Sequence, residues 1–361
     1  MKIAVLMSGG IDSTFAALYL KKKGFDIFGI TFLHIGKTKQ KEEIDKVKKI
    51  AKELSIPHYV FKIRNIFEKE IISDFCETYK KGETPNPCSF CNKKIKFGVV
   101  LKKAENYGAK KIATGHYVCL RKEITHSPKF QILKAKDKQK DQSYFLWQLT
   151  QKELKKTIFP LGSFIKRDVF KEIKNSNLSK FFKRESNKER GYSESQGICF
   201  LEEKKLSDFL KEKLKKNPGP ILNKDGKVLG KHEGVYFFTI GQRNKIKIGA
   251  TSPSQRPLYV TKIDKKKNAI FVGHEENLYG KNLIAKDVNW VLGKPPNLST
   301  KIQAQIRYGH RPIPAIIKKF SKNKIYIEFK KPQRAITIGQ SVVFYKRDLL
   351  LGGGIIKEII N

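Results

Sequence analysis

The first third of the sequence alternates between short apolar runs and longer stretches with helical spacing. The apolar runs at residues 2–7, 26–33, 58–63 and 111–114 predict strands. The stretches at residues 13–23, 41–54, 66–79 and 92–107 predict helices. Strands separated by helices of this length indicate an α/β fold with a parallel, doubly wound sheet, in which ligands bind at the carboxyl ends of the strands.

The pattern changes in the second half of the chain. A helical stretch at residues 206–214 is followed by a break rich in proline and glycine at 217–220. Short apolar or alternating runs follow at residues 258–263, 269–272, 302–308, 315–320, 324–329 and 340–345. Strands at this spacing predict a small β domain or barrel. We expect three domains: an α/β domain at 1–200, a small central domain at 201–280 and a C-terminal β-barrel-like domain at 281–361.

Composition adds a strong positive charge to this picture. The 361 residues include 75 Lys and Arg against 34 Asp and Glu, so the formal net charge is +41. Such a charge suggests a polyanionic partner, although lysine outnumbers arginine 64 to 11, a bias that genome composition also produces. The hydrophobic fraction of 39% is enough to build cores, which excludes wholesale disorder.

The cysteines and the apolar runs of the sequence indicate the cellular compartment in which we expect the protein. No run nears the roughly 20 residues that span a bilayer, and the apolar N-terminus is too short for a signal peptide. Five cysteines in such a chain indicate reduced, reactive or metal-binding thiols rather than a disulfide scaffold. We therefore expect a cytoplasmic protein with no membrane attachment.

The strongest local motif lies between the first predicted strand and the first predicted helix. It reads Ser8-Gly9-Gly10-Ile11-Asp12-Ser13. Adjacent glycines let the backbone approach an anion closely, and the helix N-terminus adds N–H donors. Asp12 would repel a phosphate unless it serves a bridging Mg²⁺ or fixes the loop. The six residues resemble the pyrophosphate loop of the N-type ATP pyrophosphatases, which cleave ATP between the α- and β-phosphates.

Two separated segments carry cysteines. Residues 84–92 contain two prolines and end in Cys88-Ser89-Phe90-Cys91-Asn92. We expect a helix to begin at Asn92, which would place Cys91 near a helix N-terminus beside several lysines and lower the pKa of its thiol. The second segment, residues 194–200, places Cys199 between apolar neighbours, and on its own such a cysteine is more often a core residue.

Together with other motifs, these segments resemble the tRNA-specific 2-thiouridylase family over nearly the whole chain. The other motifs are Ala113-Thr114-Gly115-His116-Tyr117, residues 140–146, residues 239–243, Arg307-Tyr308, and residues 339–341 with 351–356. The resemblance implies an ATP-dependent tRNA-uridine 2-sulfurtransferase. Such an enzyme adenylates the C2 carbonyl oxygen of the wobble uridine and then transfers persulfide sulfur, giving 2-thiouridine, AMP and pyrophosphate.

The resemblance also implies roles for individual residues. Cys91 corresponds to the catalytic nucleophile and Cys199 to the cysteine that carries the persulfide. The implied ATP-site residues are Leu6, Met7, Ser8, Gly9, Gly10, Ile11, Asp12, Ser13, Phe32 and Gly115. The implied contacts with tRNA or the target base are Asn86, Pro87, Cys88, His116, Lys140, Asp141, Gln142, Arg307, Tyr308 and Gln340.

The same resemblance implies the cofactors and partners. These are ATP, Mg²⁺, a persulfide sulfur donor, an upstream sulfur-carrier protein and the anticodon arm of the tRNAs for Lys, Glu and Gln, bound by a monomeric enzyme. Two routes for sulfur stay open at this point. The terminal persulfide sulfur attacks C2 directly, or Cys91 frees hydrosulfide by forming a disulfide with Cys199, and a reductant must restore the thiols.

One departure from the family opens a metal alternative. Some members have an aspartate, considered a general base, where this chain has Cys88, so that role lacks an obvious carboxylate here. Cys88, Cys91, His116 and Cys119 form a CxxC…HxxC pattern that could bind a metal. An iron–sulfur cluster on Cys88, Cys91 and Cys199 is a second possibility. We favour redox-active cysteines and assign no metal site.

Two other functions compete with the leading hypothesis. The first is another adenylating enzyme with the same loop, either a different tRNA thiolase or a small-molecule synthetase, and the cysteine pair and the C-terminal motifs argue against it. The second is a non-catalytic basic RNA-binding protein. The intact glycine loop at residues 8–13 argues against that, because a mere binder needs no pyrophosphate loop.

Overall fold

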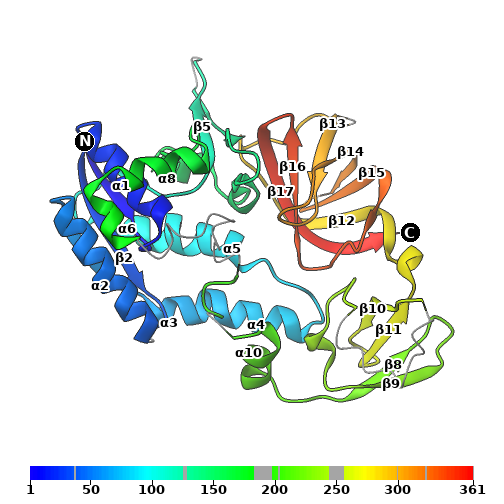
Figure 1. Cartoon of the computed structure of the whole chain (residues 1–361). Helices are drawn as coiled ribbons and strands as arrows, with labels where there is room; N and C mark the ends of the chain where they lie inside the picture. Colours follow the sequence, from blue (N-terminus) through cyan, green and yellow to red (C-terminus); the bar gives the residue numbers. More distant parts are fainter. Residues whose placement is uncertain are drawn as a thin grey trace.

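Three sheets organise the residues that the structure describes. The computed structural model describes residues 1–35, 38–124, 128–182, 197–201, 204–243, 256–298, 300–321 and 323–360. The sheets have five, four and eight strands. Figure 1 shows the five-stranded sheet with its helices on one side of the molecule and the other two sheets on the opposite side.

The five-stranded sheet is the parallel sheet that the sequence predicts. Its order is β3 (His58–Lys62), β2 (Asp26–Leu33), β1 (Lys2–Leu6), β4 (Lys111–Ala113) and β7 (Thr157–Ile158). Every neighbouring pair of these strands is parallel. The carboxyl ends of β1, β2 and β4 therefore lie at one edge, where a doubly wound sheet binds its ligand.

Helices cover both faces of this sheet because its central strands are apolar on both sides. Ile3 and Val5 of β1 pack with α1 (Ile11–Lys22), α2 (Thr38–Glu53) and α8 (Lys166–Lys174). Ala4 and Leu6 pack with two long helical runs on the other face. One run joins α3 (Arg64–Phe67), η1 (Glu68–Ile72) and α4 (Ser73–Lys80); the other joins α5 (Pro87–Phe90), η2 (Cys91–Val100) and α6 (Leu101–Glu105).

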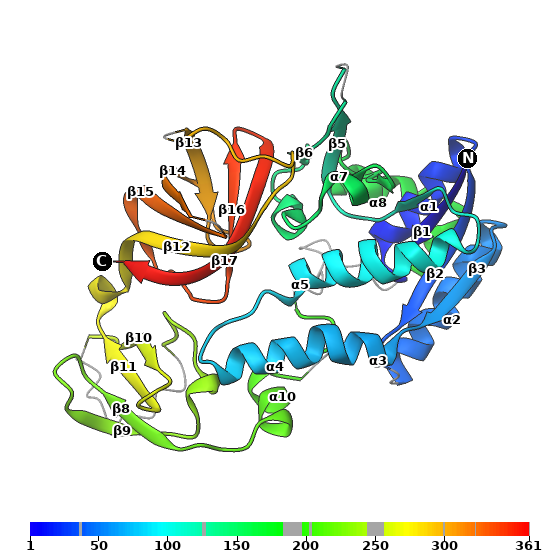
Figure 2. The same cartoon turned by 180° about the vertical axis from the view of Figure 1, so that it is seen from behind.

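The two helical runs connect the sheets. Figure 2 shows both of them extending from the parallel sheet toward the other two sheets. The small sheet has the order β10 (Tyr259–Asp264), β11 (Ala269–Gly273), β8 (Gly219–Leu222) and β9 (Val228–His232), and α10 (Leu206–Lys213) precedes it. Phe209 of α10 packs edge-on against Phe75 of α4, with ring centroids 6.1 Å apart. This contact attaches the small unit to the α/β unit.

Six strands of the large sheet close into a barrel. They are β12 (Tyr279–Trp290), β15 (Lys324–Arg334), β14 (Ile313–Ser321), β13 (Lys301–Gln305), β16 (Ser341–Lys346) and β17 (Leu349–Ile360). Pairing of β17 with β12 closes the ring. Two further strands, β5 (Val118–Lys122) and β6 (Phe130–Lys134), extend the sheet through the pairing of Leu133 with Leu349. A hairpin from the first half of the chain therefore belongs to the sheet of the last strand.

Short elements complete the described chain. They are η3 (Ser143–Leu146), α7 (Gln151–Leu154), η4 (Asn177–Phe181), η5 (Val235–Phe237) and η6 (Glu275–Leu278). The predicted fold class is confirmed: a doubly wound α/β unit, a small central unit and a β-barrel. In the described parts of the chain, no helix combines the length and the apolar character needed to cross a membrane.

Candidate active site

The loop after β1 is built to approach an anion. Gly9 has a φ of +82°, a conformation that glycine adopts without strain, and Gly10 is the N-cap of α1. Ser13 Oγ donates to the Gly10 carbonyl at 3.0 Å and accepts the Ser8 N–H at 3.1 Å, so the loop closes on itself. Its glycines and hydroxyls and the start of α1 supply the kind of donors that a polyphosphate needs.

A buried lysine neutralises the carboxylate of this loop. Lys166 Nζ lies 2.7 Å from both carboxylate oxygens of Asp12, and the Tyr117 hydroxyl donates to Oδ1 at 2.7 Å. Asp12 therefore fixes the loop, which is one of the two roles that the sequence left open. Sequence reasoning missed Lys166, because it lies 154 residues away from Asp12 along the chain.

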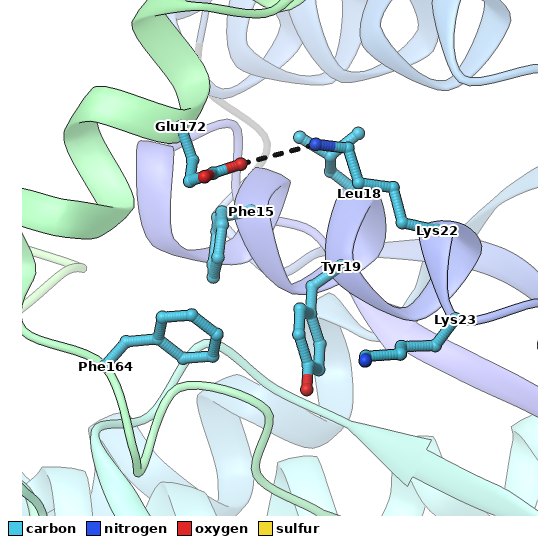
Figure 3. A pocket seen from close by; sticks show the side chains of 7 residues that line it. All are labelled: Phe15, Leu18, Tyr19, Lys22, Lys23, Phe164 and Glu172. Carbon is cyan, nitrogen blue, oxygen red and sulfur yellow. Dashed lines mark hydrogen bonds and ion pairs between the residues drawn. The ribbon is translucent and has the colours of Figure 1, made fainter.

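Aromatic packing anchors the helix that presents the loop. The Phe164 ring packs edge-on against Phe15 and Tyr19 of α1, at centroid distances of 5.0 and 5.2 Å. Lys22 pairs with Glu172 of α8 at 3.3 Å (Figure 3). The hollow drawn in Figure 3 is lined by these side chains on the outer face of α1. The aromatic contacts and the Lys22–Glu172 ion pair hold α1 against α8, and so hold Asp12 near Lys166.

Not every residue of the implied ATP site offers a side chain. Leu6, Met7 and Ile11 are buried in the cores on either side of the sheet. Their contribution to a ligand is therefore limited to the backbone. Phe32 is half-buried at the end of β2.

Gly115 shows why a side chain is excluded where β4 meets the loop. A Cβ atom at Gly115 would lie 2.9 Å from the backbone carbon of Asp12 and from the Ser13 nitrogen. The neighbouring His116 is buried and interacts with the Thr114 hydroxyl at 2.7 Å. Burial lowers the pKa of His116 well below its usual value, so the ring is neutral. The His116 ring packs inside the protein near Phe97 and Phe159 rather than facing solvent.

The helix that carries Cys91 starts earlier than expected. Pro87 opens the helical run, so Cys88 is in its first turn and Cys91 lies one turn inside. Burial raises the pKa of the Cys91 thiol to about 11, and Lys96 opposes this shift. The prediction of a lowered pKa for Cys91 is therefore wrong, because desolvation outweighs the nearby lysines. Burial also raises the pKa of Cys88.

Cys199 lies at the edge where β2 ends. Its Sγ is 3.7 Å from Nε2 of His34, which follows β2. Burial, with repulsion from Cys91 and Cys88, raises the pKa of Cys199 to about 12, while Lys96 and the Phe200 N–H lower it. Cys199 and Cys88 are nevertheless exposed residues, although protein surrounds their thiols on most sides. The three thiols thus interact electrostatically, and all are free. Residues 194–196 of this motif lie outside the described residues.

The loop before Cys88 is held by the barrel. Thr84 N–H donates to the Ile338 carbonyl at 2.9 Å. Gln340 Nε2 donates to the carbonyls of Thr84 and Pro85 at 3.1 and 2.9 Å, and Asn86 Nδ2 donates to Ser341 Oγ at 3.1 Å. Gln340 and the buried Asn86 were expected at the tRNA. In the structure their amides join the barrel to the cysteine loop.

Residues 140–142 support the turn that follows the hairpin of β5 and β6. The Asp141 carboxylate accepts the Ala135 N–H at 2.9 Å and the Ser143 hydroxyl at 2.7 Å. Burial raises the Asp141 pKa, and these hydrogen bonds oppose the shift. Gln142 Oε1 accepts the Tyr117 N–H at 3.1 Å, and Lys140 N–H donates to the Asp137 carbonyl.

Arg307 and Tyr308 follow β13 on the barrel. The Arg307 guanidinium donates to the carbonyls of Arg334 and Ala335, both at 2.8 Å. Tyr308 is 41% exposed and packs on the Phe145 ring at a centroid distance of 4.4 Å. An exposed aromatic ring backed by a second ring is a surface on which a base can stack.

The suggested metal ligands do not assemble across the described part of the chain. There, no three His, Cys, Asp or Glu side chains form a group that could hold a metal ion. Cys119 lies on β5 opposite Leu133 of β6, and the charged groups that shift its pKa are Lys138, Asp141 and Asp348 rather than Cys88 or Cys91.

Fold and site together define a class of protein. A phosphate-binding loop at the edge of a parallel sheet, with accessible thiols at the same edge, belongs to a nucleotide-dependent α/β enzyme that works with sulfur. Three family patterns cover the chain: "tRNA methyl transferase HUP domain" at residues 1–203, "tRNA methyl transferase PRC-barrel domain" at 207–274 and "Aminomethyltransferase beta-barrel domain" at 280–356.

Relatives of full length are more specific. The tRNA-specific 2-thiouridylase MnmA 2 of Thermoanaerobacter sp. is 42% identical over 371 residues, covering 99% of this chain and 98% of its own. The enzyme MnmA 1 of Caldanaerobacter subterraneus is 41% identical, covering 100% and 99%. The chain belongs to the tRNA-specific 2-thiouridylases, a family of tRNA-uridine 2-sulfurtransferases whose HUP domain implies the use of ATP. The resemblance seen in the sequence is thereby confirmed.

One solved structure adds little to this assignment. The U34-tRNA thiolase NcsA from Methanococcus maripaludis, described with its [4Fe-4S] cluster, is 20% identical to this chain. The superposition covers 52% of this chain and 66% of that chain, with a TM-score of 0.33.

Proposed function

We propose that this chain converts the wobble uridine of tRNA to 2-thiouridine in two steps, activation by ATP and transfer of sulfur. The observation that carries the proposal is the meeting of the phosphate loop and the thiols at one edge of the parallel sheet. The loop follows β1, and the His34 that contacts Cys199 follows the neighbouring strand β2.

The first step uses the loop at residues 8–13. A carbonyl oxygen is a poor leaving group, and adenylation turns it into part of AMP. The donors of the loop and of the start of α1 bind the departing pyrophosphate. Asp12 is already paired with Lys166, so Mg²⁺ would be held largely by the phosphate oxygens. The positive charge of Lys166 also lets a loop with a carboxylate accept an anion.

The second step uses Cys199 and Cys91. Cys199 carries the persulfide, which reaches C2 directly or after attack by Cys91 that releases hydrosulfide. In the second route the Cys91–Cys199 disulfide forms and the hydrosulfide takes the place of AMP at C2. Burial raises the pKa of both thiols, so local donors and the bound substrates would have to favour the thiolates in this step.

The tRNA is held by its anticodon arm, with the wobble base extruded from its loop. Pro87 and Cys88 at the helix start face the target base, and Asn86 positions them. Tyr308 supplies the exposed ring. Lys140, Asp141, Gln142, Arg307, His116 and Gln340 shape or contact this surface.

The wider assignments belong to the same proposal. Residues 1–200 perform adenylation and carry both cysteines, 201–280 contact tRNA, and 281–361 form the barrel. The enzyme acts as a cytoplasmic monomer on the tRNAs for Lys, Glu and Gln. A sulfur-carrier protein loads Cys199.

A reconstituted thiolation assay tests this function. Protein, ATP, Mg²⁺, glutathione persulfide and unmodified tRNA for Lys are incubated, and 2-thiouridine is measured by mass spectrometry of digested nucleosides. We expect activity in the wild type and in Cys119→Ser, and none in Cys91→Ser or Cys199→Ser. Nucleotide binding should survive in all variants. Wild-type rates in either of the last two variants would refute the two-thiol mechanism.

A further inference from the structure

The sulfur of Cys199 has a histidine neighbour that the proposed mechanism does not yet use. His34 follows β2, and its Nε2 lies 3.7 Å from Cys199 Sγ, within hydrogen-bonding range for sulfur. The ring packs against Phe67 at a centroid distance of 4.5 Å and against Phe32 at 5.2 Å. These contacts hold the imidazole in place beside the thiol.

A buried glutamine determines which ring nitrogen carries the proton. Gln40 Oε1 accepts the backbone N–H groups of His34 and Ile35 at 3.2 and 2.9 Å. The amide is therefore oriented with its NH₂ group toward His34, and Nε2 of Gln40 lies 2.6 Å from His34 Nδ1. Although the Phe32 carbonyl is 3.3 Å from Nδ1, the shorter contact makes Nδ1 the acceptor. The neutral ring then has its N–H on Nε2, facing the sulfur.

We propose that His34 is a further catalytic residue, which donates a hydrogen bond from Nε2 to Cys199 Sγ and stabilises the thiolate that takes up sulfur. The inference rests on the proposed role of Cys199 as sulfur carrier. A neutral imidazole protonated at Nε2 cannot act as a base toward this thiol, so its role is that of a donor.

The surroundings of Cys199 show why such a donor is needed. Burial and the neighbouring thiols Cys91 and Cys88 disfavour the thiolate. Lys96 and the backbone N–H of Phe200 favour it, and the thiol pKa nevertheless stays near 12. Hydrogen bonds to an ionised group are among the stronger ones in proteins, so a second donor beside the Phe200 N–H matters in this balance.

The step that His34 assists is the loading of Cys199. The Cys199 thiolate attacks the outer sulfur of a donor persulfide, R–S–SH. The S–S bond of the donor breaks, R–S⁻ leaves, and Cys199–S–SH forms. No external oxidant is consumed, because the sulfane sulfur moves from one thiol to another.

Two substitutions test whether His34 acts as a hydrogen-bond donor, as a base or only through its packing. His34→Met keeps the bulk but removes the N–H, whereas His34→Gln places an amide NH₂ near the position of Nε2 and cannot act as a base. Each variant is treated with glutathione persulfide at several pH values, and the persulfide on the Cys199 peptide is timed by mass spectrometry. His274→Met, at the N-cap of η6, controls for the loss of a histidine. Melting temperature and nucleotide binding report whether each variant folds.

We expect His34→Met to load Cys199 at least about tenfold more slowly near neutral pH, with the deficit shrinking at high pH. His34→Gln should recover most of the rate. Equal loading by His34→Met and wild type would overturn the proposal, as would a His34→Gln variant that folds but is as slow as His34→Met. The assay contains no tRNA, so these results are distinct from a failure of thiolation itself.

Discussion

Lys166 neutralises the Asp12 carboxylate, which would otherwise repel the phosphates that the loop should bind. A carboxylate in the first turn of a helix interacts favourably with the helix dipole, but it repels the phosphates that the same helix end should bind. The Lys166 side chain, only 10% exposed, places a cation against both carboxylate oxygens. The loop thus keeps its shape without presenting a net negative charge.

We predict that Lys166→Met destabilises the fold by about 1–3 kcal/mol and weakens ATP binding, because the partly buried Asp12 carboxylate loses its cation and keeps only the Tyr117 hydroxyl as a partner. Urea unfolding and nucleotide titration measure the two effects. Asp12→Asn combined with Lys166→Met should cost less than the sum of the single changes. Lys22→Met is the control: it removes the exposed ion pair between Lys22 of α1 and Glu172 of α8, and it should cost about 0–1 kcal/mol. Additive effects of Asp12→Asn and Lys166→Met would contradict the coupling.

The α/β elements are the ones that the sequence could predict, because each is defined by its own hydrophobic pattern. The run at residues 26–33 matches β2 at both ends. The two glycines of the loop lie between β1 and α1 as expected, but α1 begins at Ile11, two residues before the predicted start. The predicted start of the Cys91 helix, Asn92, is wrong by several residues, because the helical run begins at Pro87. The helix begins at Pro87 because proline fits the first turn of a helix, where its missing N–H would have no partner.

Other features depend on partners far away in sequence. The hairpin of β5 and β6 joins a sheet through β17, and Lys166 reaches Asp12 across the α/β unit. Gln340 and Asn86 match motifs of the family, but the motif alone does not reveal that each amide bonds to the protein itself. No local pattern encodes such contacts.

Residues 338–341 of the barrel, which we call the latch, hold the cysteine loop at residues 84–88 through hydrogen bonds. Ser341 Oγ accepts from Asn86 Nδ2 and from Trp147 Nε1 at 3.1 and 3.0 Å, and all three residues are buried. We predict that Ser341→Ala destabilises the protein by about 1–3 kcal/mol for each donor left unsatisfied and slows thiolation.

Chemical unfolding and the thiolation rate measure this prediction. Ser321→Ala, at the exposed end of β14, is the matched control and should stay within about 0.5 kcal/mol of the wild type. A Ser341→Ala variant with unchanged stability would show that the latch does not hold the loop.

The whole chain carries 41 more cationic than anionic side chains. Such an excess attracts tRNA by releasing counterions from its phosphates, and it does so without selecting a base. In our proposal, the loop before Cys91 and the exposed Tyr308 ring select the base, a task that needs few charges.

We predict that the affinity for tRNA falls at least about tenfold between about 50 and about 200 mM salt. The thiolation rate at saturating tRNA should change much less, because every enzyme molecule then already holds its tRNA. Filter binding and single-turnover kinetics at matched salt concentrations measure the two quantities. Affinity that does not depend on salt would contradict this division of labour.

The shared sheet of hairpin and barrel also matters while the protein is being made. The hairpin of β5 and β6 leaves the ribosome long before β17, the strand that it pairs with. Until β17 arrives, the hairpin presents an open edge, and the cysteine loop lacks its latch. A product of interrupted translation would therefore be a ready substrate for proteases and chaperones, and it would not persist as an enzyme that consumes ATP without modifying tRNA.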